Sequence, residues 1–309
     1  MKKRIGVDLG GTTAKLGVVN EHNEIEDRLV IPTDHTLSFE EIIARLAQGI
    51  LSLGDVGTVG FGVPSCLKSG SDIIIYANNF GWKNKDLRGE LQKHLPHIPI
   101  YIANDADAAA VGEYFLGAGR GYASMLMLTL GTGVGGAYIH QHRLFLGGDG
   151  SGLEPGHIII RRDGERCTCG MRGCLEAYAS ATALNREIQK NASPLLRKLM
   201  EENGGKPNGR MLFDAIRAGD EKAQSILDDY VASLAAGLGS LITVLRPQVA
   251  VIGGGVSGAG EMLLNPLREK MKETVYSYDV AGCPPIVPAA LGNDAGIIGA
   301  ALLDRVLGA

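Results

Sequence analysis

Two glycine-rich turns, each between two short apolar segments, restrict the fold of this chain more than any other feature of its sequence. Residues 4–19 read as a buried strand, a turn at Gly10–Thr13 and a returning strand. Residues 124–140 repeat this pattern around a turn at residues 131–136. The two turns begin 121 residues apart, so the sequence predicts two related lobes that each open with a glycine-tipped hairpin.

The length and composition fit this prediction. The chain has 309 residues, which at roughly 100–200 residues per domain allows two domains. Hydrophobic residues make up 45% and charged residues 21%, which excludes a disordered chain. A net charge of −4, without long runs of one sign, gives no general attraction for nucleic acid or anionic membranes. We therefore expect a small-molecule ligand and neither nucleic acid nor membrane as a partner.

The start of the sequence does not read as a targeting segment. The apolar stretch after the basic residues 2–4 is interrupted at once by Asp8 and the glycines that follow it. No continuous apolar run approaches the ~20 residues needed to span a bilayer. Three of the five cysteines lie within eight positions, which in this setting favours a metal over disulfides. These features predict a soluble cytoplasmic protein.

The other apolar segments alternate between strand and helix patterns, as in an α/β fold. Ser38, followed three residues later by Glu41, has the spacing of a helix capping box. Small residues in the last expected helix would allow it to pack closely. The expected strands are residues 58–63, 98–103 and 249–252, and the expected helices are residues 38–53, 105–116, 221–245 and 294–307.

The cysteine cluster is the most specific local pattern. Cys167, Cys169 and Cys174 supply three thiolates, and His157 lies ten residues upstream of the first. Three thiolates and one imidazole complete a tetrahedral zinc shell with no open position, which is typical of a structural site. The alternatives are buried apolar cysteines or a disulfide.

Asn104 and Asp105 follow a predicted strand, at the edge where α/β proteins place their ligands. An aspartate there can accept a proton from a substrate hydroxyl, and the asparagine can hold the same substrate. Alternatively, Asp105 only caps the helix that follows. Asp107 is expected to be an acid of the helix surface or the first helical turn.

Glu154 and Glu176 lie on either side of the cysteine cluster, so a zinc ion would hold them close together. Carboxylates held in this way suit vicinal hydroxyl groups, although two solvated surface acids would look the same in the sequence. Trp82 follows two amides and could line a sugar site, but a single tryptophan more often serves in packing.

The pattern GxGxxG occurs twice, at residues 131–136 and 253–258. A dinucleotide fingerprint requires a strand before the loop and a helix after it, which excludes the first match and leaves the second open. The pattern GxxxxGK[ST] of the common phosphate-binding loop is absent from the sequence. Backbone N–H groups in glycine hairpins can still bind phosphate, and plain tight turns are the alternative.

In these residues the chain resembles the ROK family of sugar kinases and repressors, most closely its bacterial ATP-dependent glucokinases. The resemblance covers essentially the whole chain. Its pieces are Asp8-Leu9-Gly10-Gly11-Thr12, Asn79-x-x-Trp82, Asn104-Asp105, Gly131-Thr132-Gly133-Val134-Gly135-Gly136, Glu154-x-x-His157, Cys167-x-Cys169-Gly170-x-x-Gly173-Cys174-x-Glu176 and Gly253-Gly254-Gly255.

The resemblance implies an actin-like ATPase (ribonuclease H-like) fold, with two α/β lobes around a cleft. The small lobe is expected at residues 1–118 plus 292–309 and the large lobe at residues 119–291. By resemblance, Asp105 is the catalytic base and Asp8 holds hydrated Mg²⁺. The expected sugar ligands are Asn79, Asn104, Asp105, Glu154, His157 and Glu176. The expected ATP-binding residues are Gly10, Gly11, Thr12, Thr13, Gly131, Thr132, Gly133, Gly254 and Gly255, with zinc on His157, Cys167, Cys169 and Cys174.

The implied activity is phosphorylation of glucose at its 6-hydroxyl by ATP, in a homodimer or homotetramer. The alternatives are the same chemistry on mannose, fructose, allose or N-acetylmannosamine, a sugar-sensing regulator without turnover, and a nicotinamide-dependent oxidoreductase based on residues 253–258. The family's repressors carry an N-terminal DNA-binding domain, for which this sequence leaves no room before residue 4. Pro155 and Ala137 depart from the family pattern without removing a functional side chain.

Overall fold

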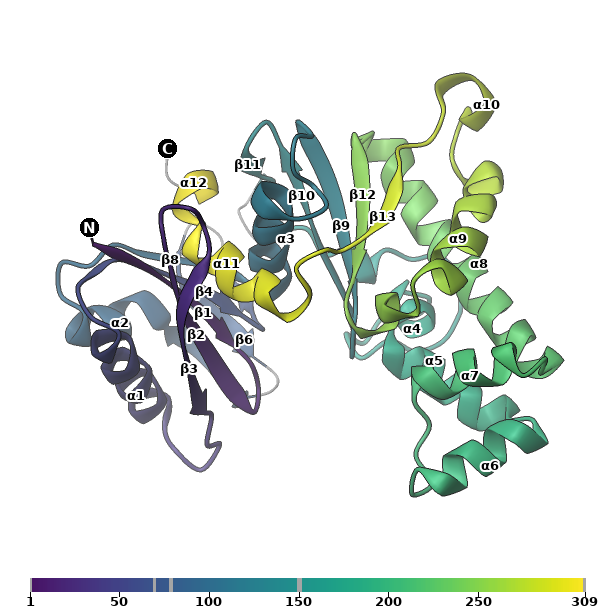
Figure 1. The fold of residues 1–309 in the computed structure, drawn as a ribbon, viewed down its shortest axis with the longest axis horizontal. Helices are drawn as coiled ribbons and strands as arrows, with labels where there is room; N and C mark the ends of the chain where they lie inside the picture. The colour runs from purple at the N-terminus through teal and green to yellow at the C-terminus, as the bar shows by residue number, and fades with distance from the viewer. Residues whose placement is uncertain (1, 69–70, 78–79, 149–151, 308–309) are drawn as a thin grey trace. The chain divides into compact units, whose positions relative to one another are not determined.

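The computed structural model of the chain describes residues 2–68, 71–77, 80–148 and 152–307 (Figure 1). The chain forms two compact units. Unit 1 comprises residues 1–124, 137–153 and 290–309, and unit 2 comprises residues 125–136 and 154–289. Each unit contains an α/β arrangement, as the sequence predicts.

Unit 1 is built on a five-stranded sheet with the order β3-β2-β1-β4-β8. The first three strands form the predicted hairpin and its extension, and β4 and β8 run parallel to β1. Asp8 is level with Gly62, and Val63 is level with Asn104, so the carboxyl ends of β1, β4 and β8 lie at one edge. The strands are β1 (Lys3–Leu9), β2 (Thr13–Val19), β3 (Ile25–Pro32), β4 (Val56–Val63) and β8 (Ile100–Asn104).

The helices of this unit begin where local signals place them. The predicted capping box is present, since Ser38 and Glu41 each accept a hydrogen bond from the other's backbone N–H. This confirms the first predicted helix. The helices are α1 (Phe39–Ser52), α2 (Leu87–His94), α3 (Asp105–Leu116), α11 (Ala295–Ala301) and α12 (Asp304–Leu307).

Helix α11 packs closely against β1, β4 and α3, as its small residues predict. A Cβ atom on Gly6 would lie 1.9 Å from the carbonyl oxygen of Ile297, and one on Gly60 would lie 1.8 Å from that of Ala300. The prediction of one continuous helix over residues 294–307 was wrong. The helix ends at Ala301 because the chain turns to bury the side chains of both Leu302 and Leu303.

A small antiparallel sheet belongs to the same unit and consists of β5 (Cys66–Leu67), β6 (Ile73–Ala77) and β7 (Trp82–Asp86). Trp82 is only 6% exposed. Its ring stacks on Phe80 at 4.2 Å between centroids and meets Phe39 edge-on at 4.9 Å. The single tryptophan therefore serves in packing.

The second sheet has the order β11-β10-β9-β12-β13, with β12 parallel to both of its neighbours. Its strands are β9 (Ser124–Leu130), β10 (Val134–His140), β11 (Arg143–Leu144), β12 (Val249–Gly253) and β13 (Ile286–Pro288). The turn between β9 and β10 is shorter than predicted, because the backbone becomes extended at Val134. Gly136 lies inside the strand, where a Cβ atom would come within 2.3 Å of the carbonyl oxygen of Met127.

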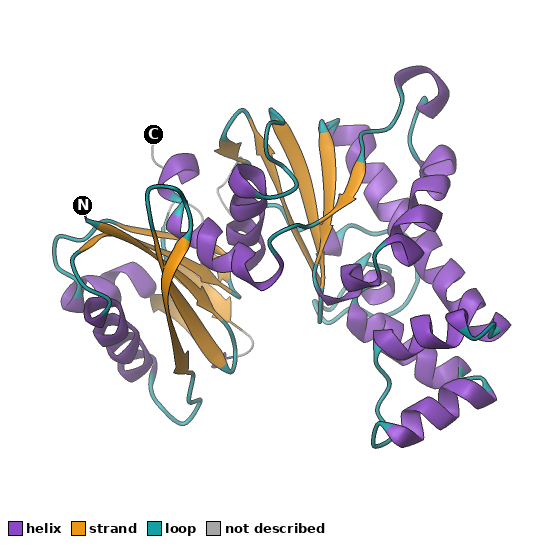
Figure 2. Ribbon diagram, viewed as in Figure 1, coloured by secondary structure: helices purple, strands orange, loops and turns teal. Residues whose placement is uncertain are grey.

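The helices of unit 2 gather on one side of β12 and β13 (Figure 2). They are α4 (Glu176–Ala179), α5 (Ala181–Asn191), α6 (Pro194–Glu202), α7 (Gly209–Arg217), α8 (Glu221–Leu245), α9 (Glu261–Thr274) and α10 (Tyr278–Ala281). Helix α8 has the predicted bounds and is capped by Asp220. It is the one described helix long and apolar enough to cross a membrane, but 67% of its apolar window is buried, as in a core helix.

Candidate functional site

In unit 1, the parallel strands bring the first group of predicted residues together. Asp8 lies on β1 and Asp105 begins α3, directly after β8. The strand between them carries Gly62, where a Cβ atom would lie 3.6 Å from the Cα of Asp105 and 2.9 Å from the side chain of Ala108. A larger residue at this position would therefore push α3 away from the sheet edge.

The two readings of Asp105, base or helix cap, can be compared directly. Asn104 is the cap residue, and its Oδ1 accepts the N–H of Ala106 at 2.8 Å. Oδ1 of Asp105 also accepts this N–H, at 2.9 Å. The Nδ2 of Asn104 donates to the carbonyl oxygen of Ser65 at 3.1 Å, which fixes the orientation of its amide. The carboxyl group of Asp105 thus shares the cap but is not required for it.

The residue Asp105 keeps solvent-accessible surface, but many protein atoms surround its carboxyl group. The resulting loss of hydration raises the pKa of this group, the N–H of Ala106 partly opposes the rise, and the neighbouring charge of Asp8 adds to it. A carboxylate that is accessible and more basic than usual suits proton abstraction.

Asp8 lies in a crowded position. Burial raises its pKa, and the Lys15 ammonium on the neighbouring strand, 4.0 Å away, opposes the rise. A Cβ atom on Gly296, at the start of α11, would come 3.0 Å from the Cγ of Asp8. The backbone of α11 therefore closes one side of this carboxylate.

The first glycine hairpin begins two residues after Asp8. The N–H of Gly10 donates to the carbonyl oxygen of Thr13 at 2.9 Å, which closes the turn. Thr33, just beyond β3, holds the tip by donating its N–H to Thr12 and its hydroxyl to Gly10. Within the described part of the chain, the N–H groups of Gly11 and Thr12 donate to no other residue, as phosphate binding requires.

Two acids of α3 are more buried than the sequence indicates. Asp107 lies in the first helical turn, which was one of the two expectations, but it is only 5% exposed, so the other expectation, an acid of the helix surface, was wrong. Glu113 had drawn no prediction and is fully buried. Its carboxylate accepts the backbone N–H groups of Ala118, Ala290 and Leu291 at 2.7–3.0 Å. Glu113 thus fastens the segment that leads into α11.

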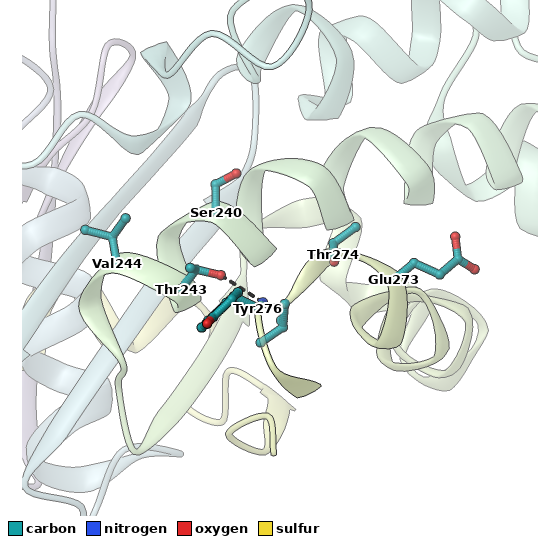
Figure 3. A pocket seen from close by; sticks show the side chains of 7 residues that line it. Ser240, Thr243, Val244, Glu273, Thr274 and Tyr276 are labelled. Atoms are coloured by element: carbon teal, nitrogen blue, oxygen red, sulfur yellow. Dashed lines mark hydrogen bonds between the residues drawn. The ribbon is translucent and has the colours of Figure 1, made fainter. Parts of the chain in front are cut away.

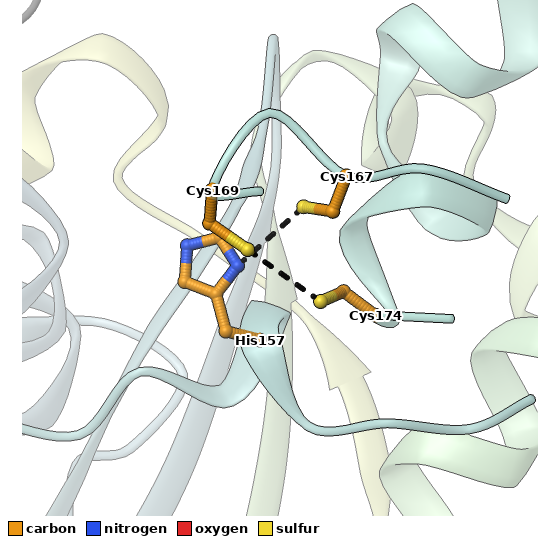
Figure 4. Close-up of side chains that lie close together, drawn as sticks. All are labelled: His157, Cys167, Cys169 and Cys174. Carbon is orange, nitrogen blue, oxygen red and sulfur yellow. Dashed lines mark hydrogen bonds between the residues drawn. The ribbon is translucent and has the colours of Figure 1, made fainter. Parts of the chain in front are cut away.

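In unit 2, the four predicted zinc ligands lie together (Figure 4). Their ligand atoms all lie within 4.8 Å of one another. The Sγ atoms of Cys169 and Cys174 are 3.7 Å apart, and Sγ of Cys167 is 3.7 Å from Nδ1 of His157. Zinc–sulfur bonds of about 2.3 Å place tetrahedral sulfur ligands about 3.8 Å apart, whereas a disulfide requires about 2.05 Å. The geometry fits zinc and excludes the disulfide.

The surroundings of the three thiols change their acidity in different directions. Burial raises the pKa of Cys174 to about 12 and also raises that of Cys167. Burial acts in the same direction on Cys169, but the N–H of Met171 and the neighbouring thiols outweigh it and lower its pKa. Zinc binding would therefore displace protons from this cluster.

Glu176 joins the cysteine loop to the second glycine hairpin. Its Oε2 accepts the N–H of Val134 at 3.1 Å, and its Oε1 accepts the hydroxyl of Thr168 at 2.9 Å. A Cβ atom on Gly133 would lie 2.3 Å from Oε2. The sequence placed Glu176 near the cysteines but did not indicate its contact with the hairpin.

The turn that carries the other predicted sugar ligands lies against the same hairpin. Glu154 precedes the short helix η2 (Pro155–His157), whose proline occupies the first position. A Cβ atom on Gly156 would lie 2.0 Å from the carbonyl oxygen of Val134, so this turn is in direct backbone contact with β10. Nδ1 of His157 faces Cys167, which leaves Nε2 for another partner.

The predicted adenosine loop also adjoins the second hairpin. Gly254 has φ +83°, and a Cβ atom there would lie 2.5 Å from the backbone N of Leu130. Gly255 begins the short helix η3 (Gly255–Ala259), and a Cβ atom on it would meet open space. The short helix and the long α9 that follows do not by themselves distinguish ATP from a dinucleotide.

Asn79, a predicted sugar ligand, lies outside the described residues.

A hollow of about 470 Å³ opens in unit 2, between the end of α8 and residues 273–276 (Figure 3). Its polar groups are satisfied locally: Thr243 donates to Gly239 and accepts the N–H of Tyr276. None of the predicted site residues lines it.

The folds of solved structures agree with this architecture. The ROK family glucokinase from Streptomyces griseus, in complex with glucose and AMPPNP, superposes with a TM-score of 0.83 and 34% identity over 97% of this chain and 98% of that chain. Together with the two α/β units and their glycine hairpins, this match defines a protein with the actin-like ATPase fold.

Sequence comparisons define the family. The model of the ROK family matches residues 4–306. The glucokinase of Thermotoga maritima is 40% identical, covering 98% of this chain and 97% of that protein. The glucokinase of Halalkalibacterium halodurans is 35% identical, covering 97% of this chain and 94% of that protein. The chain belongs to the ROK family, and the resemblance read from its motifs is confirmed.

Proposed function

We propose that this protein transfers the γ-phosphoryl group of ATP to the 6-hydroxyl of glucose. The observation that carries the proposal is the 40% identity to a glucokinase along nearly the whole of both chains. The arrangement within each unit supports the proposal. Unit 1 holds a carboxylate with a raised pKa and a glycine hairpin. Unit 2 holds a second hairpin, a carboxylate that contacts it and a cluster of four possible zinc ligands.

Unit 1 supplies the groups for proton transfer and metal binding. Asp105 accepts the proton of the 6-hydroxyl, and Asn104 and Asn79 hold the sugar. Asp8 is the ligand for hydrated Mg²⁺, and the free N–H groups of the tip formed by Gly10, Gly11, Thr12 and Thr13 bind phosphate oxygens. When bound, Mg²⁺ neutralises the charge that develops on the phosphate oxygens.

Unit 2 supplies the remaining residues that bind the sugar and the nucleotide. Glu154, His157 and Glu176 hold sugar hydroxyls, and Gly131, Thr132 and Gly133 bind phosphate. Gly254 and Gly255 lie beside the adenosine. Zinc on His157, Cys167, Cys169 and Cys174 has four protein ligands, so it is structural and holds the loop from which the sugar ligands project.

The chemical step follows from these roles. Asp105 orients the 6-hydroxyl in line with the γ-phosphorus and accepts its proton as the O–P bond forms and ADP leaves. General-base action of this kind typically contributes ~10²–10⁴ in rate. A cytoplasmic location and assembly as a homodimer or homotetramer are part of this proposal.

A coupled assay of ADP release across a panel of hexoses tests the function. We expect the highest kcat/KM for glucose, with mannose, fructose, allose and N-acetylmannosamine lower. A higher kcat/KM for another hexose would reassign the substrate within the family. Sugar binding without ADP release would instead indicate the non-catalytic regulator.

A further inference from the structure

We infer that Glu176 is a positioning residue for the second glycine hairpin, and that nucleotide affinity therefore depends on the cysteine loop even when no sugar is bound. This inference rests on the proposed function, because it assigns a second role to a residue of the proposed sugar site. It concerns residues within unit 2 only.

The carboxylate is shared between two segments that lie far apart in the sequence. Oε2 accepts the N–H of Val134, the first residue of β10, while Oε1 accepts the hydroxyl of Thr168 and lies 3.5 Å from Sγ of Cys167. Oε2 thus contacts only the hairpin, and Oε1 contacts only the cysteine loop. Because an ionised carboxylate offers about four acceptor positions, both contacts are compatible with a further bond to a sugar hydroxyl.

The hairpin tip rests on the chain that follows Glu176. The N–H of Ala181 donates to the carbonyl oxygen of Gly131 at 2.8 Å. The hydroxyl of Thr182 donates to the backbone carbonyl oxygen of Thr132 at 2.7 Å. With the bond from Val134 to Glu176, the tip is held at both of its ends. Within the described part of the chain, the N–H groups of Thr132 and Gly133 donate to no residue and are left for a phosphate.

The geometry also explains why the charge matters. The Glu176 carboxylate occupies the space that a Cβ atom on Gly133 would fill, at 2.3 Å. A hydrogen bond from a backbone N–H to a carboxylate is about twice as strong as a neutral one. Thr168 keeps the other oxygen turned toward the cysteine loop, so the direction of the carboxylate is set by a residue that does not itself bind zinc.

Calorimetric titration with Mg²⁺ and AMPPNP in the absence of sugar tests the inference on the zinc-loaded protein. We expect Glu176→Gln to weaken nucleotide binding by about tenfold, because the neutral amide oxygen is a weaker acceptor for the hairpin N–H than the carboxylate. Thr168→Val should weaken it by roughly threefold, and Thr168→Ser, which keeps the hydroxyl, should restore it. Thr182→Val, which removes another anchor of the tip, serves as the positive control.

Ser240→Ala is the matched control for hydroxyl loss in the same unit, since Ser240 only donates to the carbonyl oxygen of Ala236. Its nucleotide affinity should equal that of the wild type. Zinc content and melting temperature of each variant separate positioning from unfolding. Unchanged nucleotide affinity in both Glu176→Gln and Thr168→Val, with zinc retained, would overturn the inference. A wild-type protein that binds no nucleotide would instead overturn the proposed function.

Discussion

Each of the two glycine hairpins joins its strands through three residues, but the two have different supports. The first is held by Thr33, which follows the last residue of β3 in the same unit, and is flanked by the charges of Asp8 and Lys15. The second is held by residues 176–182 and lies against the cysteine loop. The repeat in the sequence therefore corresponds to a repeated strand–turn–strand arrangement, while the residues around each hairpin determine its chemistry. In the proposed function, the first hairpin lies beside the groups for metal binding and proton transfer, and the second lies beside the sugar ligands.

The largest effect should come from Asp105→Asn, which tests whether the chemical step belongs to unit 1. We expect kcat to fall by ~10²–10⁴ while the affinities for glucose and nucleotide stay within about twofold. The base must be ionised, so wild-type activity should fall as the pH drops through the raised pKa of Asp105. The variant should lose this dependence. Steady-state kinetics at several pH values measure both, and near-wild-type kcat would leave Asp105 as a helix-cap residue only.

Removing one thiolate should produce the next largest effect, and it should act on the sugar ligands and the hairpin of unit 2, not on the first hairpin. The wild-type protein should carry about one zinc per chain, and Cys169→Ser should release it. We expect sugar affinity to fall by roughly ten- to a hundredfold, as for loss of the groups that orient a site. The sequence alone predicts little change in nucleotide affinity, but the bond between Glu176 and Val134 predicts a smaller fall there as well.

Cys283→Ser is the control, because this half-buried cysteine lies outside the cluster. Metal analysis after purification without chelators, followed by calorimetry, makes the measurement. Zinc retained in Cys169→Ser would contradict the ligand set. A fully active, zinc-free wild-type protein with reduced cysteines would contradict the site itself.

Two neighbouring glycines of the second hairpin should differ in their tolerance of a methyl group. Gly133→Ala would force its Cβ against Glu176, whereas a Cβ on Gly131 meets open space. We expect Gly133→Ala to weaken both sugar and nucleotide binding by about tenfold and to lower the melting temperature by a few degrees. Gly131→Ala should leave the melting temperature unchanged. Equal melting temperatures for the two variants would show that the hairpin does not depend on Glu176.

The smallest effect should come from Lys15→Met, which removes a charge that only the first hairpin has. The ammonium lowers the pKa of Asp8, so its loss should raise that pKa and move the acid limb of activity to higher pH. Because Lys15 is 42% exposed, we expect no more than a few-fold change in kcat/KM. Lys85→Met, which breaks an exposed pair with Glu40, is the control. An identical pH profile in both variants would remove Lys15 from the site.

The features that could be predicted from the sequence depend on residues close together in the chain. The capping box of Ser38 and Glu41, the bounds of α8 and the turn at Gly10 are fixed by local hydrogen bonds and periodicity. The zinc ligands could be found because three of the four are separated by only one and four residues, so their spacing alone indicates a common centre.

The features that were missed depend on contacts between distant segments. In the sequence Glu113 looks like an ordinary helix residue, because the backbone N–H groups of Ala290 and Leu291 that donate to it belong to a distant segment. The only local clue was Gly117, where a Cβ atom would lie 1.9 Å from the Glu113 carboxylate. The burial of Asp107 was missed for the same reason, since it results from segments that pack against α3. The bond between Glu176 and Val134 spans 42 residues and has no sequence pattern of its own.

The packing of α11 has a consequence for the order in which the protein is completed during synthesis. The glycines of β1, β4 and α3 leave space for a helix whose residues follow the whole of unit 2 in the chain. Ribosomes add roughly 5–20 residues per second, and domains generally fold as units while the chain emerges. The sheet that is translated first must therefore wait, with the part of one face that α11 covers still exposed, until residues 290–301 appear.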